Sequence, residues 1–247
     1  EPMTLLSAVS ARTTHLGLAA TIATSYRPPY DAAREVLSLD RVSGGRAGWN
    51  VVTGISPDDG AQYADQNFPP QEERYARGEE FVDVVLKLWS SIEAGSYPHN
   101  KEEGNYKDAS KIRLIHHEGK YYRVRGPLKG IASDQGRPLL IQAGQSPEGR
   151  AMASRIAEVI FTAQSTFEQA KAFRDDIHAR ATAWGRDPDH VKILPGALVV
   201  LGDSRAEAED KWASLDSFID LRAAQARLQM ALKFYDLTGH DLDAPSP

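Results

Sequence analysis

The feature that most constrains the fold of this chain is a repeated alternation of short apolar strands with amphipathic helices. Five strand patterns are each followed by a helix pattern, and they centre on Leu18, Val51, Leu140, Ile160 and Leu198. Such alternation produces a parallel sheet with right-handed crossovers. The sequence therefore predicts an α/β fold, either a doubly wound sheet or a (β/α)8 barrel. Five units are fewer than the eight that close a barrel, so a barrel needs strands that this chain does not show.

Periodicity and capping residues predict the individual elements. Helices are expected near Leu5 to Val9, over 28–43 and 75–92, from Ser146 and Pro147 onward, and over 166–186, 205–221 and 224–235. Strands are expected over 15–24, 46–54, 139–141, 157–163 and 191–204, the last of them interrupted by Pro195 and Gly196. A hairpin is expected over 111–126, with its turn at Glu118 and Gly119. All of these elements are expected to form a single domain, 1–247.

Two segments between the predicted elements look like insertions. The first, 54–74, is rich in turn formers, and the second, 93–125, combines a polar stretch with the predicted hairpin. Loops of this length inside a compact domain are uncommon unless they are functional. We therefore expect both segments to be insertion or lid regions beside the site.

Composition excludes several classes of protein. The formal net charge of -5 is spread along the chain, so neither a nucleic-acid-binding arm nor a polybasic membrane helix is indicated. The chain has no cysteine, which removes disulfides and cysteine nucleophiles and suits a cytoplasmic protein. No run approaches the length of a membrane-spanning helix.

The turn after the strand at Leu140 is the first candidate site. Ala143, Gly144 and Ser146 separate that strand from a helix, and Pro147 suits the first helical position. Such a turn can be plain punctuation between two elements. It can also hold a phosphate, because the first N–H groups of a helix are unpaired and its amino end carries partial positive charge. The residues alone leave both interpretations open.

Histidines and paired acids offer little evidence of a metal or hydrolytic site. His116 and His117 are adjacent in a predicted strand, so their side chains point to opposite faces and cannot easily share an ion. The acidic pairs Asp58-Asp59 and Glu79-Glu80 do not lie at predicted strand ends. We therefore predict no metal, and the sequence assigns no catalytic acid or base.

Three stretches resemble one family. "SGGRAGWNVVTG", "GKYYRVRGPL" and "QGRPLLIQAGQSPEGR" are similar to segments of the luciferase-like flavin-dependent monooxygenases grouped with nitrilotriacetate monooxygenase component A, dibenzothiophene-sulfone monooxygenase and long-chain alkane monooxygenase. The resemblance runs over nearly the whole chain. It implies a (β/α)8 barrel of which this chain is a fragment, with two strands before Glu1 and one after Pro247.

The resemblance also implies a function. It predicts a two-component monooxygenase that takes FMNH2 from a separate NAD(P)H:flavin reductase and uses O2 as co-substrate. One oxygen atom would pass to a small organic substrate through a flavin C4a-peroxide. The complete protein would be a homo-oligomer, dimer or tetramer. Two rival predictions stay open, namely a deazaflavin-dependent oxidoreductase on the same barrel and a flavin-binding protein without activity.

Six residues are implied to contact the cofactor. The resemblance places Ala143, Gly144 and Ser146 at the FMN phosphate, and the other three at the ring or ribityl chain: Thr24, Asn50 and Tyr75. Each of those three also has an ordinary structural interpretation. Asn50 could tie two strands together through its amide, Thr24 is unexceptional at a strand end, and Tyr75 could be a half-buried aromatic at a helix start.

Overall fold

The structure is a computed structural model that describes residues 1–247 except 55–59, 64–67, 233–234, 238 and 241–247. The chain divides into two compact units, Glu1–Gly196 and Ala197–Pro247. Each unit is described by itself below.

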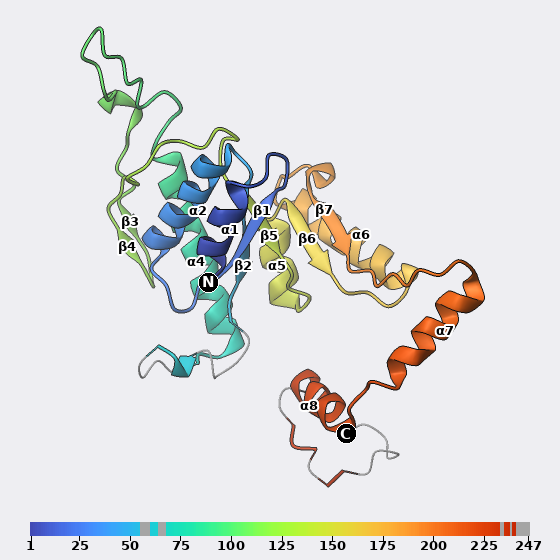
Figure 1. The fold of residues 1–247 in the computed structure, drawn as a ribbon. Helices are drawn as coiled ribbons and strands as arrows, with labels where there is room; N and C mark the ends of the chain where they lie inside the picture. Colours follow the sequence, from blue (N-terminus) through green and yellow to red (C-terminus); the bar gives the residue numbers. More distant parts are fainter. Residues whose placement is uncertain (55–59, 64–67, 233–234, 238, 241–247) are drawn as a thin grey trace. The chain divides into compact units, whose positions relative to one another are not determined.

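The first unit is built on a parallel sheet of five strands in the order β1-β2-β5-β6-β7 (Figure 1). The strands are β1 (Leu18–Ala23), β2 (Ala47–Val52), β5 (Leu139–Gln142), β6 (Val159–Thr162) and β7 (Lys192–Pro195). The registers pair Thr21 with Asn50 and Asn50 with Ile141, and they place Phe161 beside Leu194. The predicted α/β class and the parallel sheet are confirmed.

The first helix precedes the sheet, and the others lie in the connections between its successive strands. They are α1 (Pro2–Ser10), α2 (Pro29–Ser43), α4 (Gln71–Ser90), α5 (Pro147–Ile156) and α6 (Phe167–Ala183), with 3-10 turns η1 (Ala109–Lys111) and η2 (Pro188–His190). Residues Gly44 and Gly45 both have positive φ and end α2, as the sequence predicts. Alternate strand residues such as Leu140 and Ile160 are fully buried against the helices.

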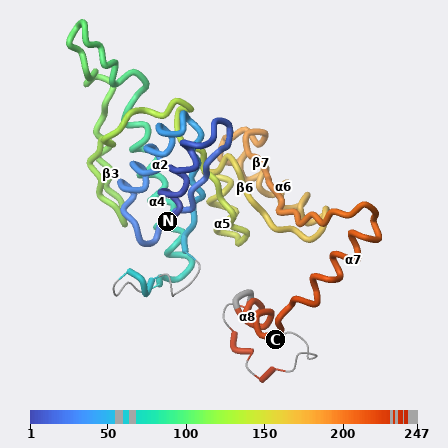
Figure 2. Tube along the Cα trace, in the orientation of Figure 1, coloured from blue at the N-terminus to red at the C-terminus, as the bar shows by residue number. Residues whose placement is uncertain are grey.

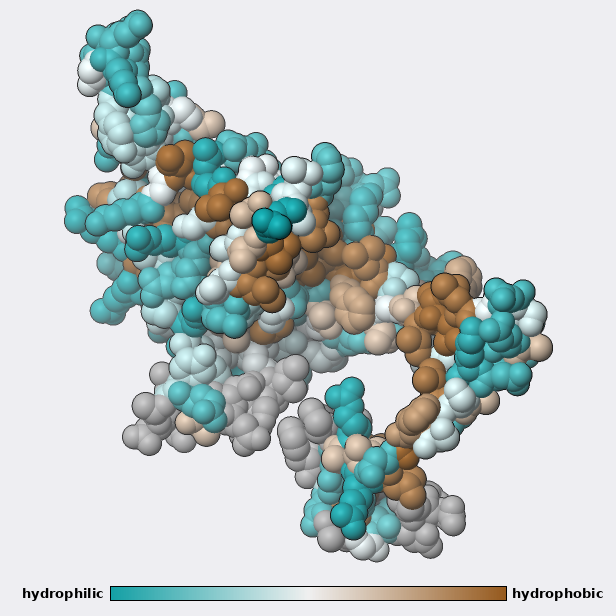
Figure 3. Space-filling model, in the orientation of Figure 1, coloured by the Kyte–Doolittle hydropathy of each residue, from teal (hydrophilic) through white to brown (hydrophobic). Residues whose placement is uncertain are grey.

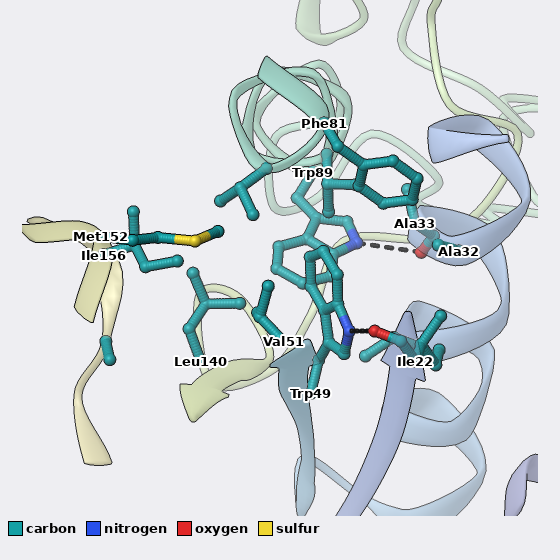
Figure 4. Close-up of a cluster of buried hydrophobic side chains, with 14 of the residues drawn as sticks. Ile22, Ala32, Ala33, Trp49, Val51, Phe81, Trp89, Leu140, Met152 and Ile156 are labelled. Carbon is teal, nitrogen blue, oxygen red and sulfur yellow. Dashed lines mark hydrogen bonds between the residues drawn. The ribbon is translucent and has the colours of Figure 1, made fainter. Parts of the chain in front are cut away.

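The centre of the core lies between the sheet and the pair α2 and α4 (Figure 4). Trp49 from β2 and Trp89 from α4 meet edge to face, with ring centroids 6.3 Å apart. Each indole N–H is paired, because Trp49 donates to the Ile22 carbonyl at 3.1 Å and Trp89 donates to the Ala33 carbonyl at 2.9 Å. These bonds fix β1, β2, α2 and α4 relative to one another.

The opposite face of the sheet is open. Side chains alternate across a strand, so the partners of the buried residues point away from the helices. On this face Leu139, Phe161 and Leu194 are 38%, 48% and 53% exposed. In a closed barrel this concave face would form the interior; here we call it the inner face, and it also carries Thr21 and Asn50.

Two predicted boundaries are wrong. Helix α4 begins at Gln71 rather than Tyr75, since Pro70 precedes it and Glu72 and Glu73 suit its first turn. The last strand of the sheet ends at Pro195, whereas the sequence places its centre at Leu198. A proline lacks the N–H that a ladder needs, and the following Gly196 N–H bonds only the Thr162 carbonyl. The apolar run after it, including Leu198 and Leu201, is largely exposed.

The predicted insertion 93–125 is described in full. It reaches away from the helices and returns as a short antiparallel hairpin of β3 (His117–Glu118) and β4 (Arg123–Val124), which lies along the outer side of α2 and α4 (Figures 1 and 2). The hairpin prediction is thus confirmed. Of the other predicted lid, 54–74, residues 55–59 and 64–67 lie outside the described residues.

The second unit contains helices α7 (Arg205–Asp216) and α8 (Leu221–Ala231). Apolar side chains gather on the segment that leads into α7 (Figure 3), where Leu198, Val199 and Leu201 are all more than 70% exposed. In the described parts of the chain no helix combines the length and the hydropathy needed to span a bilayer.

Candidate functional site

The turn between β5 and α5 has the geometry of an anion-binding helix start. Ser146 is the N-cap of α5, and its Oγ accepts a hydrogen bond from the Gly149 N–H at 3.1 Å. Pro147 occupies the first helical position and lacks an N–H of its own. A hydroxyl that accepts at the cap still has its own proton to donate. Ser146 can therefore donate to an oxyanion placed at the positive end of the helix.

The glycines of this turn are needed for packing. A Cβ built on Gly144 would lie 2.7 Å from the Gly149 Cα, and one on Gly149 would lie 2.8 Å from the Gly144 Cα. The Gly144 N–H is already donated to the Gln142 side-chain oxygen. Gly144 therefore has no room for a side chain. The neighbour that fills this space, however, is the first turn of α5 itself, so substituting Gly144 would not test phosphate binding cleanly.

Tyr75 joins this turn from the neighbouring helix. Its hydroxyl would lie 3.0 Å from a Cβ on Gly149, and Gln71 in the same helix donates to the Glu148 carboxylate at 2.9 Å. The amino-terminal turns of α4 and α5 are therefore side by side. The structure thus brings Tyr75 together with Ala143, Gly144 and Ser146, although they are about seventy residues apart in the sequence.

Arg74 is a candidate that the sequence prediction missed. It precedes Tyr75 on α4, and its guanidinium lies 4.0 Å from the centroid of the Phe68 ring and donates to the Pro69 carbonyl at 2.7 Å. Burial lowers the pKa of Arg74, and its Nε is buried without a partner among the described residues. The sequence feature that could have identified Arg74 is its place directly before Tyr75, near the start of a helix.

Asn50 lies on the inner face of the sheet. Its Nδ2 donates to the Thr21 Oγ1 at 3.0 Å, so the amide does tie β1 to β2. Its Oδ1, however, is buried and has no hydrogen-bond partner within the described part of the chain. Buried polar atoms are nearly always paired, so this oxygen is suited to accept a hydrogen bond from a bound molecule.

Thr24 does not share the geometry of Asn50. Its side chain is fully buried, and a Cβ built on Gly78 of α4 would lie 3.2 Å from its Oγ1. Thr24 is three residues beyond Thr21, so it points to the helix side of the sheet while Thr21 and Asn50 point to the inner face. A ligand on the inner face would therefore meet Asn50 and not the Thr24 hydroxyl.

Of the two histidines, His117 begins β3 and is buried, whereas His116 precedes the strand with a positive φ and is exposed, so the predicted alternation within one strand does not apply to them. His117 Nε2 lies 3.1 Å from a carboxylate oxygen of Glu80, and its Nδ1 lies 3.1 Å from the Lys87 Nζ. Glu80 also accepts the backbone N–H groups of Tyr121 and Tyr122. The described residues contain no group of three potential ligands that could hold a metal ion. The hydrogen bonds of Glu80 to His117 and to the two backbone N–H groups fasten the hairpin to α4.

We call the contacts of Glu80 with His117 and the hairpin backbone the hairpin anchor. The strength of this anchor is expected to depend on pH. Burial raises the pKa of Glu80, but hydrogen bonds from His117 and from the Tyr121 and Tyr122 backbone outweigh it, so the pKa lies below its ordinary value of 4.5. A carboxyl group whose pKa is lower in the folded than in the unfolded protein stabilises the fold at pH values above its unfolded pKa. This stabilisation is lost as the pH falls through the folded pKa. We expect Glu80→Gln to speed hydrogen exchange at the Tyr121 and Tyr122 amides at neutral pH, by roughly tenfold for about 1.4 kcal/mol.

The effect should shrink as pH falls below 4.5, where Glu80 itself becomes protonated. Glu79→Gln is the matched control, since Glu79 is the preceding residue of α4 and is half-buried. Equal protection of both amides in the Glu80 variant and the unchanged chain at neutral pH would contradict the anchor.

Comparison with known proteins identifies the family. The family described as luciferase-like monooxygenase matches residues 1–243. The chain belongs to this family. Nitrilotriacetate monooxygenase component A from Aminobacter aminovorans is 40% identical over 247 residues, which are 100% of this chain and 54% of the relative. The luciferase-like chain thus spans about half the length of the curated relatives it matches.

Solved structures agree with this assignment. The crystal structure of a long-chain alkane monooxygenase is 35% identical, with a TM-score of 0.93 over 100% of this chain and 57% of that one. A riboflavin lyase, solved with modified FMN and its substrate riboflavin, is 32% identical, with a TM-score of 0.91 over 99% of this chain and 55% of that one. The five-stranded sheet is accordingly part of a luciferase-like (β/α)8 barrel, as the resemblance predicts.

Proposed function

We propose that this chain forms the flavin-phosphate side of a two-component, FMNH2-dependent monooxygenase that transfers one oxygen atom from O2 to a small organic substrate. The observation that carries the proposal is the N-capped start of α5, where the Ser146 hydroxyl, Tyr75 and the first turns of two helices converge in a luciferase-like barrel. The riboflavin lyase of the same fold holds a modified FMN, which supports this choice of cofactor.

The residues present fit FMN in two places. The Ser146 hydroxyl and the amino end of α5 would bind the phosphate, with Arg74 supplying a nearby positive charge. The unpaired Oδ1 of Asn50 would accept a hydrogen bond from an N–H or O–H of the ring or ribityl chain. Reduced FMN, when bound, supplies the reaction with O2, and the chain itself orients the cofactor. A separate flavin reductase, a cytoplasmic location and a homo-oligomeric state belong to the same proposal.

Comparing FMN with riboflavin isolates the phosphate contact. Ser146→Ala should weaken FMN binding by roughly tenfold, the equivalent of about 1.4 kcal/mol, because a charge-assisted hydrogen bond is lost. Riboflavin lacks the phosphate, so its affinity should change little. Asn50→Ala should weaken both flavins by a similar factor. Fluorescence quenching on titration of each flavin measures the six dissociation constants, two for the unchanged chain and two for each variant.

The matched control is Ser204→Ala, which removes the equivalent N-cap from α7, where the Ser204 Oγ accepts from the Glu207 N–H at 3.2 Å. It removes a similar helix cap, worth about 1 kcal/mol, without touching the β5–α5 turn. The phosphate assignment is wrong if Ser146→Ala weakens FMN and riboflavin equally or leaves FMN unchanged.

A further inference from the structure

A large pocket lies between the start of α2, helix α4 and the β3–β4 hairpin. It is an open cavity of about 1050 Å³, close to the upper end of ligand-site volumes. Its walls include the β1–α2 connection through Tyr26 and Pro28, and the stretch from Tyr121 to Lys129. Neither the family match nor the flavin proposal assigns a ligand to this pocket.

The charge of this pocket is opposite to that of the chain. The whole chain carries 34 acidic and 29 basic residues, yet the pocket is lined by six basic residues and, among the described residues, by no Asp or Glu. The basic residues are Arg27, Arg77, Lys107, Arg123, Arg125 and Lys129. A pocket lined by charges of one sign focuses their electric field and attracts ligands of the opposite charge.

Among the described residues, two of these cations have a side-chain partner. Arg27 pairs with Glu35 at 2.6 Å, and the Arg77 Nε donates to the Tyr122 hydroxyl at 2.9 Å. Within the described residues the other four side chains, those of Lys107, Arg123, Arg125 and Lys129, make neither an ion pair nor a hydrogen bond. Arg123 lies in β4 and Arg125 follows that strand directly, and both line the pocket. Two guanidinium groups in the wall of one pocket can bind a carboxylate or phosphate through bidentate hydrogen bonds.

The rest of the lining is aromatic and apolar. Tyr30, Tyr97 and Tyr121 are among five tyrosines in the wall, and Ile112 and Leu114 add aliphatic surface. The Tyr30 hydroxyl accepts from the Lys129 N–H at 3.2 Å and therefore keeps a proton to donate. Such a wall can pack against the carbon skeleton of an organic ligand. An inorganic ion has no carbon skeleton and would not make these contacts.

We propose that this pocket binds an organic polyanion whose apolar body packs on the tyrosines while its carboxylate or phosphate groups meet Arg123 and Arg125. The hairpin anchor formed by Glu80 and His117 holds one wall of the pocket in place, since Tyr121 and Tyr122 both donate to Glu80. The inference is independent of the flavin proposal, because no residue assigned to FMN lines the pocket.

Equilibrium dialysis with the 247-residue chain tests separately what the negative charge and the aromatic ring of a ligand contribute to binding. Trimesate is an aromatic tricarboxylate, inorganic phosphate has charge without a body, and benzene-1,3,5-tricarboxamide has the body without charge. We expect trimesate to bind at one site per chain and each of the other two probes to bind at least roughly tenfold more weakly. Phenyl phosphate, measured beside trimesate, identifies the preferred anionic group, and tight binding of either satisfies the proposal.

The double variant Arg123→Gln with Arg125→Gln should weaken trimesate binding by at least roughly tenfold. The control Arg12→Gln with Arg222→Gln removes the same charge from exposed positions outside the pocket and should leave binding unchanged. Lys129→Gln is a second, independent pocket variant, measured in case the double variant unfolds. The proposal would be overturned if inorganic phosphate bound as tightly as the preferred aromatic anion, if the control variant lost as much binding as the pocket variant, or if neither aromatic anion bound.

Discussion

Replacing Trp49 by alanine should lower the free energy of unfolding by about 3–5 kcal/mol, the range for large aromatic truncations in a core. Trp49 is fully buried, and it packs against Phe81 and Trp89 with ring centroids 5.7 Å and 6.3 Å away. The substitution removes that packing, leaves a cavity between β2 and α4, and deletes the hydrogen bond to the Ile22 carbonyl. Because these three losses fall together on one side chain, we expect a large effect from a single change.

Chemical denaturation followed by far-UV circular dichroism measures the loss. Trp184→Ala is the matched control, because Trp184 caps α6 and is 59% exposed. The control should cost less than about 1 kcal/mol. Since Asn50 follows Trp49 in β2, we also expect Trp49→Ala to weaken FMN binding under conditions where the variant is still folded. A stability equal to that of the Trp184 variant would contradict the packing described above.

Much of the fold follows from patterns that the sequence displays. Apolar strands alternating with amphipathic helices leave a parallel sheet as the natural arrangement, and Gly44, Ser146 and Pro147 end or begin helices for reasons that depend on their immediate neighbours alone. The misplaced last strand shows where such reasoning fails. The residues 197–201 are as apolar as a buried strand, but Pro195 and Gly196 stop the ladder before them. Hydropathy measures what could be buried, while pairing depends on backbone donors.

The candidate site was predicted less completely than the fold. Local capping rules are enough to select Ser146, because an N-cap needs only its own helix. The close approach of Gly144 to Gly149, by contrast, is visible only in three dimensions. Thr24 and Asn50 looked similar because both are polar residues near the carboxyl end of an apolar strand. Whether each side chain points to the helices or to the inner face depends on its position within the paired strands. The sequence alone does not give this strand register.

The inner face of the sheet predicts how the isolated chain behaves in solution. Leu139, Phe161 and Leu194 lie on one face of neighbouring strands and are between 38% and 53% exposed. Strands β1 and β7 are also the outermost strands of the described sheet, so each has one row of backbone groups without a strand partner. Exposed apolar faces and open edges both favour association. We therefore expect the 247-residue chain to self-associate in a concentration-dependent way.

Analytical ultracentrifugation over a dilution series measures this association. The double variant Phe161→Ser with Leu194→Ser should weaken it by more than roughly tenfold, because two half-exposed side chains together lose about 2 kcal/mol of burial in the interface. The matched control is Leu198→Ser with Leu201→Ser, which alters side chains that are 73% and 78% exposed but belong to the second unit. A control variant that dissociates as readily would place the contact on the segment before α7 instead. A chain that stays monomeric at every concentration, with a cooperative melt, would show that the inner face is not an association surface, because its apolar residues would then be tolerated in water.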